Sequence, residues 1–291
     1  MKKISITIGA LLISAMTLSA AENHADSVIA EVLVNVAKLK AAMPDAVPMA
    51  FWNFDGTIIK GDVSEGLGEG ESDGKAGFKG LVEETILAGM CPVYKGESGC
   101  RQFCDVDYPR MTEIGKWLAY PYVAQIYDGV ETDALDAFCA RKVSEVYSKF
   151  YFKSSVKILR ELEKAGVENY IVSASPEIFV RNAMGSLGLP INRARGIRVE
   201  VAGGRLTTRI VYPVPFGEGK VENVRDLVLA RPNGVAVAGF GNSYSTDGNF
   251  LKYIVTQRLP GGAKGFAMMI NGGAEKPGFE GLFRLVNQEE L

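Results

Sequence analysis

The feature that most constrains the fold is an alternation of short apolar runs with longer helix-like segments over the second half of the chain. The apolar runs expected to be strands are Tyr170–Val172, Val235–Ala238 and Gly265–Ile270, together with an earlier run, Val47–Trp52. The segments with helical spacing are Ser154–Ala165, Pro176–Leu187, Val221–Leu229 and Gly248–Ile254, and Ser27–Ala42 near the start of the chain. Strands that alternate with helices predict an α/β fold with a mainly parallel sheet, in which ligands bind beyond the carboxyl ends of the strands. A hairpin is expected within residues 196–212, about the Gly203-Gly204 pair.

The stretch from Asp62 to Phe152 interrupts this alternation. A glycine-rich beginning is followed by helix-like segments near Leu81–Met90, Met111–Tyr120 and Thr132–Phe150. The 291 residues are enough for one α/β domain that carries a smaller inserted one. We therefore expect residues 62–152 to form an inserted helical domain, and residues 22–61 and 153–291 to form the main domain.

Residues 1–21 have the pattern of a cleaved signal peptide. Two lysines follow Met1, the run Ile4–Leu18 is apolar, and small residues lead to Ala21. The apolar run is shorter than the roughly 20 residues that a membrane-spanning helix needs, so stable membrane insertion is not expected. A buried N-terminal helix is the competing interpretation. The signal pattern predicts a periplasmic or secreted protein.

Charge and cysteine content narrow the possible partners. Lys and Arg total 32 against 34 Asp and Glu, and a net charge of -2 gives no general reason to bind nucleic acid. The four cysteines, Cys91, Cys100, Cys104 and Cys139, all lie in the predicted insertion. In an oxidising compartment they predict up to two disulfides, and a four-thiolate zinc site is the competing interpretation. His24, the only histidine, lies just after the signal and is not expected to be catalytic.

Four polar elements follow the ends of the predicted strands. They are Asn53-Phe54-Asp55-Gly56-Thr57, Ser173-Ala174-Ser175-Pro176, Lys220 at a helix start, and the stretch Gly241–Asp247. Hydroxyl and free backbone N–H groups at a helix start, as at Ser173 and Ala174, suit an anion such as phosphate. A lysine such as Lys220 neutralises phosphoryl charge. Carboxylate and carboxamide oxygens can hold Mg²⁺, and Asp55 is placed to exchange a proton with a leaving group.

In this order, each after a strand, the motifs resemble those of the haloacid dehalogenase-like (HAD) superfamily, and most closely its phosphoserine-phosphatase-like branch. The resemblance runs from about Val47 to the C-terminus and is carried by Phe54–Asp62 and Val172–Glu177. It implies a Rossmann-like core with a helical cap of the C1 type inserted after the first motif. The roles it implies are Asp55 as general acid/base, Thr57, Ser173 and Ala174 as phosphate supports, Lys220 as a phosphate ligand, and Mg²⁺ held by Asn53, Asp55, Asn242 and Asp247.

Two positions depart from the family pattern. Asn53 stands where the family has its nucleophilic aspartate, and a carboxamide is a poor nucleophile. Asn242 replaces the first acid of the fourth motif, so the site has two negative charges fewer for Mg²⁺. Three hypotheses account for Asn53: a natural pseudoenzyme that binds a phosphorylated ligand, an inactivated variant of a phosphatase, or slow deamidation to aspartate.

The predicted function is an exported, Mg²⁺-dependent phosphomonoester hydrolase of HAD type that acts on a small phosphorylated metabolite. The alternative is a catalytically inactive relative that binds such a metabolite. Aromatic residues are frequent in the insertion: Trp117, Tyr120, Tyr122, Tyr127, Tyr147, Phe150, Tyr151 and Phe152. They are typical either of the insertion's own core or of cation–π contacts with a quaternary ammonium group, as in phosphorylcholine.

Overall fold

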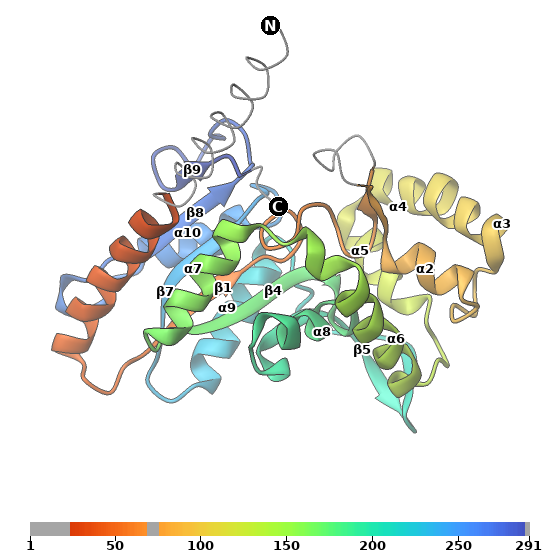
Figure 1. Ribbon diagram of the computed structural model, residues 1–291, viewed down its shortest axis with the longest axis horizontal. Coiled ribbons are helices and arrows are strands. Elements are labelled where there is room, and N and C mark those ends of the chain that lie inside the picture. Colours follow the sequence, from red (N-terminus) through yellow and green to blue (C-terminus); the bar gives the residue numbers. More distant parts are fainter. Residues whose placement is uncertain (1–23, 69–75, 289–291) are drawn as a thin grey trace, which may run out of the picture.

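A computed structural model describes residues 24–68 and 76–288 of the chain. Its centre is a seven-stranded sheet in the order β6-β5-β4-β1-β7-β8-β9 (Figure 1), and all neighbouring strands are parallel except the antiparallel pair β5 and β6. The strands of this sheet are β1 (Val47–Trp52), β4 (Glu168–Pro176), β5 (Ala194–Ala202), β6 (Arg205–Val211), β7 (Gly234–Gly241), β8 (Phe266–Ile270) and β9 (Arg284–Val286). A separate ribbon pairs β2 (Gly66–Leu67) with β3 (Phe78–Lys79). The predicted α/β fold with a mainly parallel, Rossmann-like sheet is confirmed.

Both faces of the sheet are covered, which explains why its central strands are apolar at nearly every position. Along β1, Ala50 and Trp52 face one side, Met49 and Phe51 face the other, and all four side chains are fully buried. Successive side chains of a strand point to opposite faces, so a strand covered on both faces loses the usual polar alternation. Trp52 also donates its Nε1–H to Asn169 Oδ1 (2.9 Å), which satisfies two buried polar groups.

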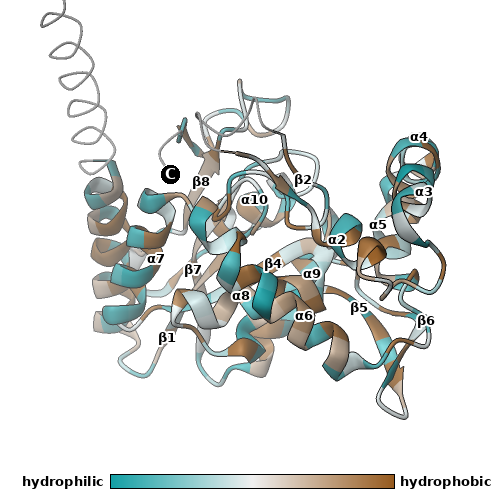
Figure 2. Ribbon diagram, turned by 45° about the vertical axis from the view of Figure 1, so that its right-hand side comes forward, coloured by the Kyte–Doolittle hydropathy of each residue, from teal (hydrophilic) through white to brown (hydrophobic). Residues whose placement is uncertain are grey.

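Helices form a layer on each face of the sheet (Figure 1). A helix over residues 24–42, α7 (Lys153–Lys164) and α8 (Glu177–Leu187) pack on one face. Helices α9 (Glu218–Ala230) and α10 (Gly248–Thr256) pack on the opposite face. Figure 2 shows hydrophilic and apolar residues alternating around α7 and the helix at residues 24–42, as expected of helices with one buried side.

The segment between β1 and β4 is mainly helical. It holds α2 (Leu81–Leu87), α3 (Gly96–Arg101), a π-helical turn (Gln102–Asp107), α4 (Tyr108–Ile114), α5 (Lys116–Gln125), α6 (Thr132–Glu145) and a 3-10 turn (Tyr147–Phe150). In Figure 1, α2 to α5 gather on the side of the molecule where β5 and β6 lie, away from β8 and β9. Helix α6 packs against α8, and buried side chains of the insertion join the hydrophobic cluster on that face of the sheet. The division into a core (residues 22–61 and 153–291) and a cap (residues 62–152) stays a prediction.

Most predicted elements are present, with changed ends. Strand β1 spans the predicted residues Val47–Trp52, and β5 and β6 form the predicted hairpin, whose two turn glycines have φ of 57° and 78°. The single helix predicted over Met111–Tyr120 is wrong, because Gly115 separates α4 from α5. The helix predicted over Thr132–Phe150 is too long, since α6 ends at Glu145 and a 3-10 turn follows. Strand β4 is longer than predicted because it pairs with both β1 and β5, and β9, α3 and the β2–β3 ribbon lie outside the predicted elements.

The four cysteines of the insertion are free thiols, so the predicted disulfides are not formed in this structure. Cys91 Sγ faces the backbone carbonyl oxygen of Ile126 at 3.4 Å, and Cys100 Sγ faces that of Glu83 at 3.7 Å. Both thiols donate to backbone carbonyls, and these contacts are the physical reason that neither Cys91 nor Cys100 is paired with another sulfur here. Within residues 24–68 and 76–288, no three His, Cys, Asp or Glu side chains are grouped to hold a metal ion.

No helix in the part of the chain that the structure describes is long and apolar enough to cross a membrane. The predicted signal peptide, residues 1–21, lies outside the described residues. Export and cleavage therefore stay predictions.

Candidate functional site

The predicted site residues meet at the carboxyl edge of the sheet, where β4, β1 and β7 lie side by side. Trp52 at the end of β1 is paired with Ile171 in β4 and with Phe240 in β7. Neighbouring parallel strands end at the same edge, so polar side chains that are far apart in the sequence come together there. Asn53 and Asn242, which lie 189 residues apart, are consequently within hydrogen-bond distance.

A buried chain of hydrogen bonds links the predicted residues. Lys220 donates from Nζ to Asp247 Oδ1 (2.6 Å) and to Asn53 Oδ1 (2.8 Å). Asn53 in turn donates from Nδ2 to Asn242 Oδ1 (2.8 Å) and to the main-chain oxygen of Asp55 (2.7 Å). The side chains of Lys220 and Asp247 have no exposed surface, so solvent does not screen their ion pair. These contacts join β1, α9 and the loop after β7 into one polar cluster.

Two close backbone approaches make this cluster possible. Asp247 Oδ2 accepts hydrogen bonds from the backbone N–H groups of Asn242 (2.9 Å) and Ser243 (3.0 Å). A Cβ at Gly241, the last residue of β7, would lie 2.6 Å from Asp247 Cβ, so a larger residue does not fit there. Gly56 has a φ of +65°, and a Cβ there would lie 2.0 Å from Asn242 Nδ2. Glycine at both positions lets the loops after β1 and β7 approach each other.

Asp55 is held in place by three hydrogen-bond donors. Its Oδ2 accepts from the hydroxyls of Ser175 (2.8 Å) and Ser173 (3.1 Å), and its Oδ1 accepts from the backbone N–H of Val63 (2.7 Å). Burial raises the pKa of the Asp55 carboxyl above its usual value, although these hydrogen bonds and the charge of Lys220 act in the opposite direction. A raised pKa favours the protonated form of the carboxyl, and a general acid must carry a proton in this way.

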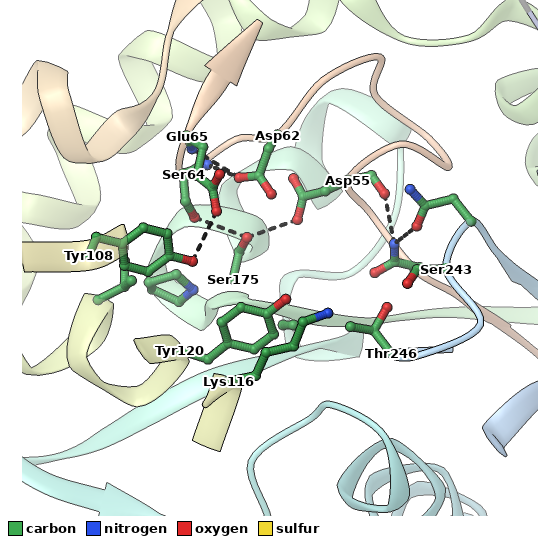
Figure 3. Close-up of a pocket in the computed structure, with 15 residues that line it drawn as sticks. Asp55, Asp62, Ser64, Glu65, Tyr108, Lys116, Tyr120, Ser175, Ser243 and Thr246 are labelled. Atoms are coloured by element: carbon green, nitrogen blue, oxygen red, sulfur yellow. Dashed lines mark hydrogen bonds between the residues drawn. The ribbon is translucent and has the colours of Figure 1, made fainter. Parts of the chain in front are cut away.

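A cavity of about 160 Å³ opens beside these residues (Figure 3). Its lining from the strand ends consists of Asn53, Asp55, Ala174, Ser175, Pro176, Asn242, Ser243 and Thr246, and its lining from the segment between β1 and β4 consists of Asp62, Ser64, Glu65, Tyr108, Lys116, Tyr120 and Val123. In Figure 3, Tyr108, Lys116 and Tyr120 approach Asp55 and Ser175 from the opposite wall. A ligand in this cavity would therefore contact both the sheet loops and the insertion.

The wall formed by the segment after β1 is acidic. Asp62 accepts two backbone N–H groups on Oδ1, and burial together with the negative charges of Asp55 and Glu65 raises its pKa well above the usual value. Tyr108 donates its hydroxyl to Glu65 Oε1 (2.9 Å), which ties α4 to this wall. Lys116, the first residue of α5, is the one cation among the described lining residues. The cavity thus combines an acidic wall with a single positive charge.

Not every predicted phosphate ligand reaches the cavity. Ala174 lines it, whereas Thr57, Ser173 and Lys220 are fully buried beneath its wall. Thr57 Oγ1 lies 3.4 Å from the Nδ2 atom of Asn53, and Ser173 and Lys220 bond to lining side chains as described above. In this structure the three buried residues contact the side chains that line the cavity, and their role as phosphate ligands stays a prediction.

The lining residues outside the predicted set include Asp62, Glu65, Tyr108 and Lys116. Asp62 ends the stretch that carries the family resemblance, so its place in that motif was a usable signal. The other three reach the cavity through contacts of the insertion with the sheet loops, for which the sequence holds no periodic or spacing signal.

Most aromatic side chains of the segment between β1 and β4 are buried. Of the eight aromatic residues named from the sequence, Tyr127, Tyr147, Phe150 and Phe152 are buried, and so are Phe78, Tyr94, Phe103 and Phe138. Trp117 is 64% exposed, and Tyr120 is the only one of the eight predicted aromatic residues among the described lining residues. Tyr108 contributes a second ring to the cavity wall. Any cation–π contact with a ligand in the cavity therefore depends on these two tyrosines.

The residues predicted to hold Mg²⁺ do not offer it free oxygen atoms. Asn53 Oδ1 already accepts a hydrogen bond from Lys220, and Asn242 Oδ1 and the main-chain oxygen of Asp55 both accept from Asn53 Nδ2. Both carboxylate oxygens of Asp247 are bonded to N–H donors. Mg²⁺ demands near-octahedral oxygen ligands at about 2.0–2.1 Å. The donor set, as it is arranged here, does not fit this cation.

Comparisons with known proteins agree with the fold. The sequence model of the haloacid dehalogenase-like hydrolases matches residues 50–247, more than half of the chain. No curated protein matches the chain. One similar solved structure is a protein of unknown function from Bordetella pertussis Tohama I, with 15% identity, coverage of 83% of this chain and 98% of that chain, and a TM-score of 0.60. Another is a HAD family hydrolase from Salmonella enterica subsp. enterica serovar Typhi, with 16% identity, coverage of 84% of this chain and 68% of that chain, and a TM-score of 0.49. A phosphoserine phosphatase in apo form has 14% identity, coverage of 84% of this chain and 94% of that chain, and a TM-score of 0.48. The likeness to the Bordetella pertussis protein shows a shared fold.

Proposed function

We propose that this chain, which belongs to the haloacid dehalogenase-like hydrolase family, binds a small phosphomonoester in the cavity at β1, β4 and β7 without hydrolysing it. The observation that carries this proposal is the carboxamide of Asn53, which lines the cavity directly after β1. The family resemblance calls for a nucleophilic carboxylate at this position. A carboxamide does not form the acyl-phosphate intermediate, because its nitrogen lone pair is delocalised and its oxygen carries no full negative charge.

The contacts of Asn53 support an ordered binding site, in which the carboxamide has hydrogen-bond partners for both its oxygen and its nitrogen. Its carboxamide is hydrogen-bonded to Lys220, Asn242 and the backbone of Asp55. The lining stretch at residues 174–176 leads into the first turn of α8, where backbone N–H groups and the helix dipole favour an anion. Lys116 adds a positive charge on the facing wall. Together these groups are the support for a phosphate at this edge of the sheet.

The opposite wall suggests that the alcohol part of the ligand is cationic. Asp62 and Glu65 supply carboxyl groups there, and Tyr108 and Tyr120 supply aromatic rings. The Glu65 carboxylate and the ring faces attract an ammonium group, and a bound cation would favour the ionised form of Asp62. A quaternary ammonium is held without any need for hydrogen-bond acceptors. Phosphorylcholine is therefore the probe of choice, and glycerol 3-phosphate is a control of similar size whose alcohol part carries no charge.

A second candidate function, phosphomonoester hydrolysis, is favoured by Asp55. Its raised pKa and its fixed position beside Ser175 are the properties of a proton donor to a leaving group. In this case the substitution at Asn53 has disabled an otherwise complete phosphatase, and a single Asn53→Asp change would restore turnover.

Two measurements on the mature chain test the proposal. Titration calorimetry in EDTA should detect binding of phosphorylcholine at least about 10-fold tighter than glycerol 3-phosphate, and ³¹P NMR should show no hydrolysis over hours. Asn53→Asp, assayed with p-nitrophenyl phosphate and MgCl₂, reports whether the nucleophile alone is missing, and the double change Asn53→Asp/Asp55→Asn is its inactive control. Absence of binding by either ligand would refute the binding role. Hydrolysis by the unchanged chain, with Asn53 verified as intact by mass spectrometry, would replace it by the second candidate.

We also propose that the ligand is bound outside the cytoplasm and under a helical cap. Export is supported by the pattern of residues 1–21, and a cap over the site is supported by Tyr108, Lys116 and Tyr120, which line the cavity from α4 and α5. Cell fractionation with N-terminal sequencing should find a mature chain that begins near Ala21 or Glu22. An uncleaved chain in the cytoplasm would contradict export and leave the ligand assignment untouched.

A further inference from the structure

Phosphatases of this family generally use Mg²⁺. The atoms around Asn53 in this chain indicate whether its site can bind that cation, a question separate from the proposed ligand. The main-chain oxygen of Asp55 lies 2.7 Å from Asn53 Nδ2, and Asn242 Oδ1 lies 2.8 Å from the same nitrogen. Both hydrogens of the amide are thus directed at oxygens of residues, Asp55 and Asn242, that the family resemblance assigns to the cation. The nitrogen sits between two oxygens that would otherwise have to share a metal ion.

Lys220 determines which way the Asn53 amide points. The oxygen and nitrogen of a carboxamide are told apart by their partners, and an ammonium group can only donate. The Lys220 Nζ atom lies 2.8 Å from Asn53, so the atom it faces must be the oxygen. Turning the amide by 180° would place N–H groups against the ammonium and an oxygen against Asp55 O and Asn242 Oδ1. Each of these contacts would be repulsive.

The lysine cannot move away to permit that turn. Its Nζ is bonded to Asp247 Oδ1 at 2.6 Å, and neither side chain has exposed surface. The partner carboxylate is itself held by the backbone N–H groups of Asn242 and Ser243. The orientation of the Asn53 amide is therefore transmitted from a rigid, buried ion pair.

We infer that the Asn53 side-chain amide takes the place of the divalent cation, so that this site is closed by hydrogen bonds and binds no Mg²⁺. Asn53 and Asn242 are both neutral, and the two carboxylates nearby, Asp55 and Asp247, have their oxygens bonded to donors. A cation entering here would have to break the two amide hydrogen bonds and would meet no free anionic ligand.

An aspartate at this position would behave differently. Its second oxygen would lie against Asp55 O and Asn242 Oδ1, where no hydrogen remains to separate the three oxygens. A divalent cation bridging them removes the repulsion, so the Asn53→Asp chain should bind Mg²⁺ and be stabilised by it. The metal requirement thus depends on one atom of one side chain and can be tested without any substrate.

The test measures metal uptake by the full mature chain and its variants. In thermal unfolding with 10 mM MgCl₂ against EDTA, the midpoint of the unchanged chain should move by less than about 1 °C, and that of Asn53→Asp should rise by about 5 °C or more. Electron paramagnetic resonance of added Mn²⁺ should show the ion free with the unchanged chain and bound with Asn53→Asp. The matched control is Asn242→Asp, which adds the same charge 2.8 Å away but keeps the amide, and it should take up no Mn²⁺.

Three results would overturn the inference. The first is Mn²⁺ uptake by the unchanged chain that is lost in Asn242→Ala. The second is uptake by Asn242→Asp as strong as by Asn53→Asp, because charge and not amide orientation would then decide. The third does not need a variant that folds: the ¹⁵N signal of the Asn53 side-chain amide should keep its shift on addition of MgCl₂, and its movement would contradict closure. None of these measurements involves a phosphorylated ligand, so the inference about the metal can be refuted while the proposed function stands, and the reverse.

Discussion

Replacing Lys220 by methionine tests whether the buried ion pair holds the site together. Lys220 Nζ lies 2.6 Å from Asp247 Oδ1, and both side chains are fully buried. In Lys220→Met the aliphatic stem remains, but Asp247 loses its counter-ion and Asn53 Oδ1 loses its donor. Removing one partner of a buried pair costs about 3–5 kcal/mol, because an uncompensated charge stays out of water. At about 2–4 °C per kcal/mol for a chain of this size, the unfolding midpoint should fall by roughly 6–20 °C.

Calorimetry of a double-mutant cycle separates the pair from its surroundings. Asp247→Asn keeps an oxygen for the two backbone N–H groups of the β7 loop, so Lys220→Met/Asp247→Asn buries no unpaired charge. Its loss of unfolding free energy should be smaller than the sum of the two single losses by at least about 2 kcal/mol. The exposed pair of Lys164 and Glu161 is the control, and Lys164→Met should cost less than about 1 kcal/mol. Single losses that simply add in the double variant would refute the argument, because the two groups would then not be coupled.

Three further predictions concern other parts of the structure. The pKa of Asp62 is raised in the folded chain by burial and by neighbouring carboxylates, so its contribution to stability is present at low pH and is lost as the pH rises through the folded pKa. Asp62→Asn should therefore raise the unfolding midpoint more at pH 8 than at pH 4, whereas the exposed control Asp45→Asn should show no such difference, and equal shifts at both pH values would contradict the assignment. Gly56→Ala should lose at least about 1–2 kcal/mol in denaturant unfolding, because its φ is +65° and the new Cβ would meet Asn242, and unchanged stability would mean that this turn is not held as described. Ellman's reagent should find one reactive thiol in the native chain, Cys104, and four after denaturation without reductant, whereas none after denaturation would establish disulfides.

The position of the site in the fold was predictable from the order of apolar runs and polar residues along the chain. Asn53, Ser173 and Asn242 each follow an apolar run, and parallel strands bring their carboxyl ends to one edge of the sheet. Once alternation with helices had indicated such a sheet, these residues were expected at its carboxyl edge whatever the exact length of each strand. That they are neighbours depends on the strand order β4-β1-β7, which the alternation does not determine. The buried position of Lys220 follows less directly, because it depends on α9 packing beside β7 and α10.

The facing wall of the cavity was not predictable in the same way. Glu65, Tyr108 and Lys116 come from a segment whose helices are short and broken, as at Gly115 between α4 and α5. Helical periodicity indicates which side of a helix is buried and does not indicate what it is buried against. Tyr108 and Glu65 are 43 residues apart in the sequence, and a π-helical turn, Gln102–Asp107, lies between them. Neither the contact nor the turn has a local sequence signal. The same limit explains the cysteines, since an even number of thiols carries no information about which sulfur atoms approach each other.

The charges of the buried cluster bear on how Asn53 arose. Asp55 is the same in both cases and leaves the comparison unchanged; with carboxamides at Asn53 and Asn242, the ion pair of Lys220 and Asp247 has a net charge of +1 − 1 = 0. With carboxylates at both positions it would be 0 − 2 = −2, which a divalent cation neutralises. The two replacements together therefore remove the same amount of negative charge as the ion would have balanced. An inactivating change at residue 53 would account for the carboxamide at that position and not for the one at residue 242. The second carboxamide, Asn242, therefore favours the hypothesis of a natural pseudoenzyme, whose site is closed by its own amide without either the metal or the nucleophile.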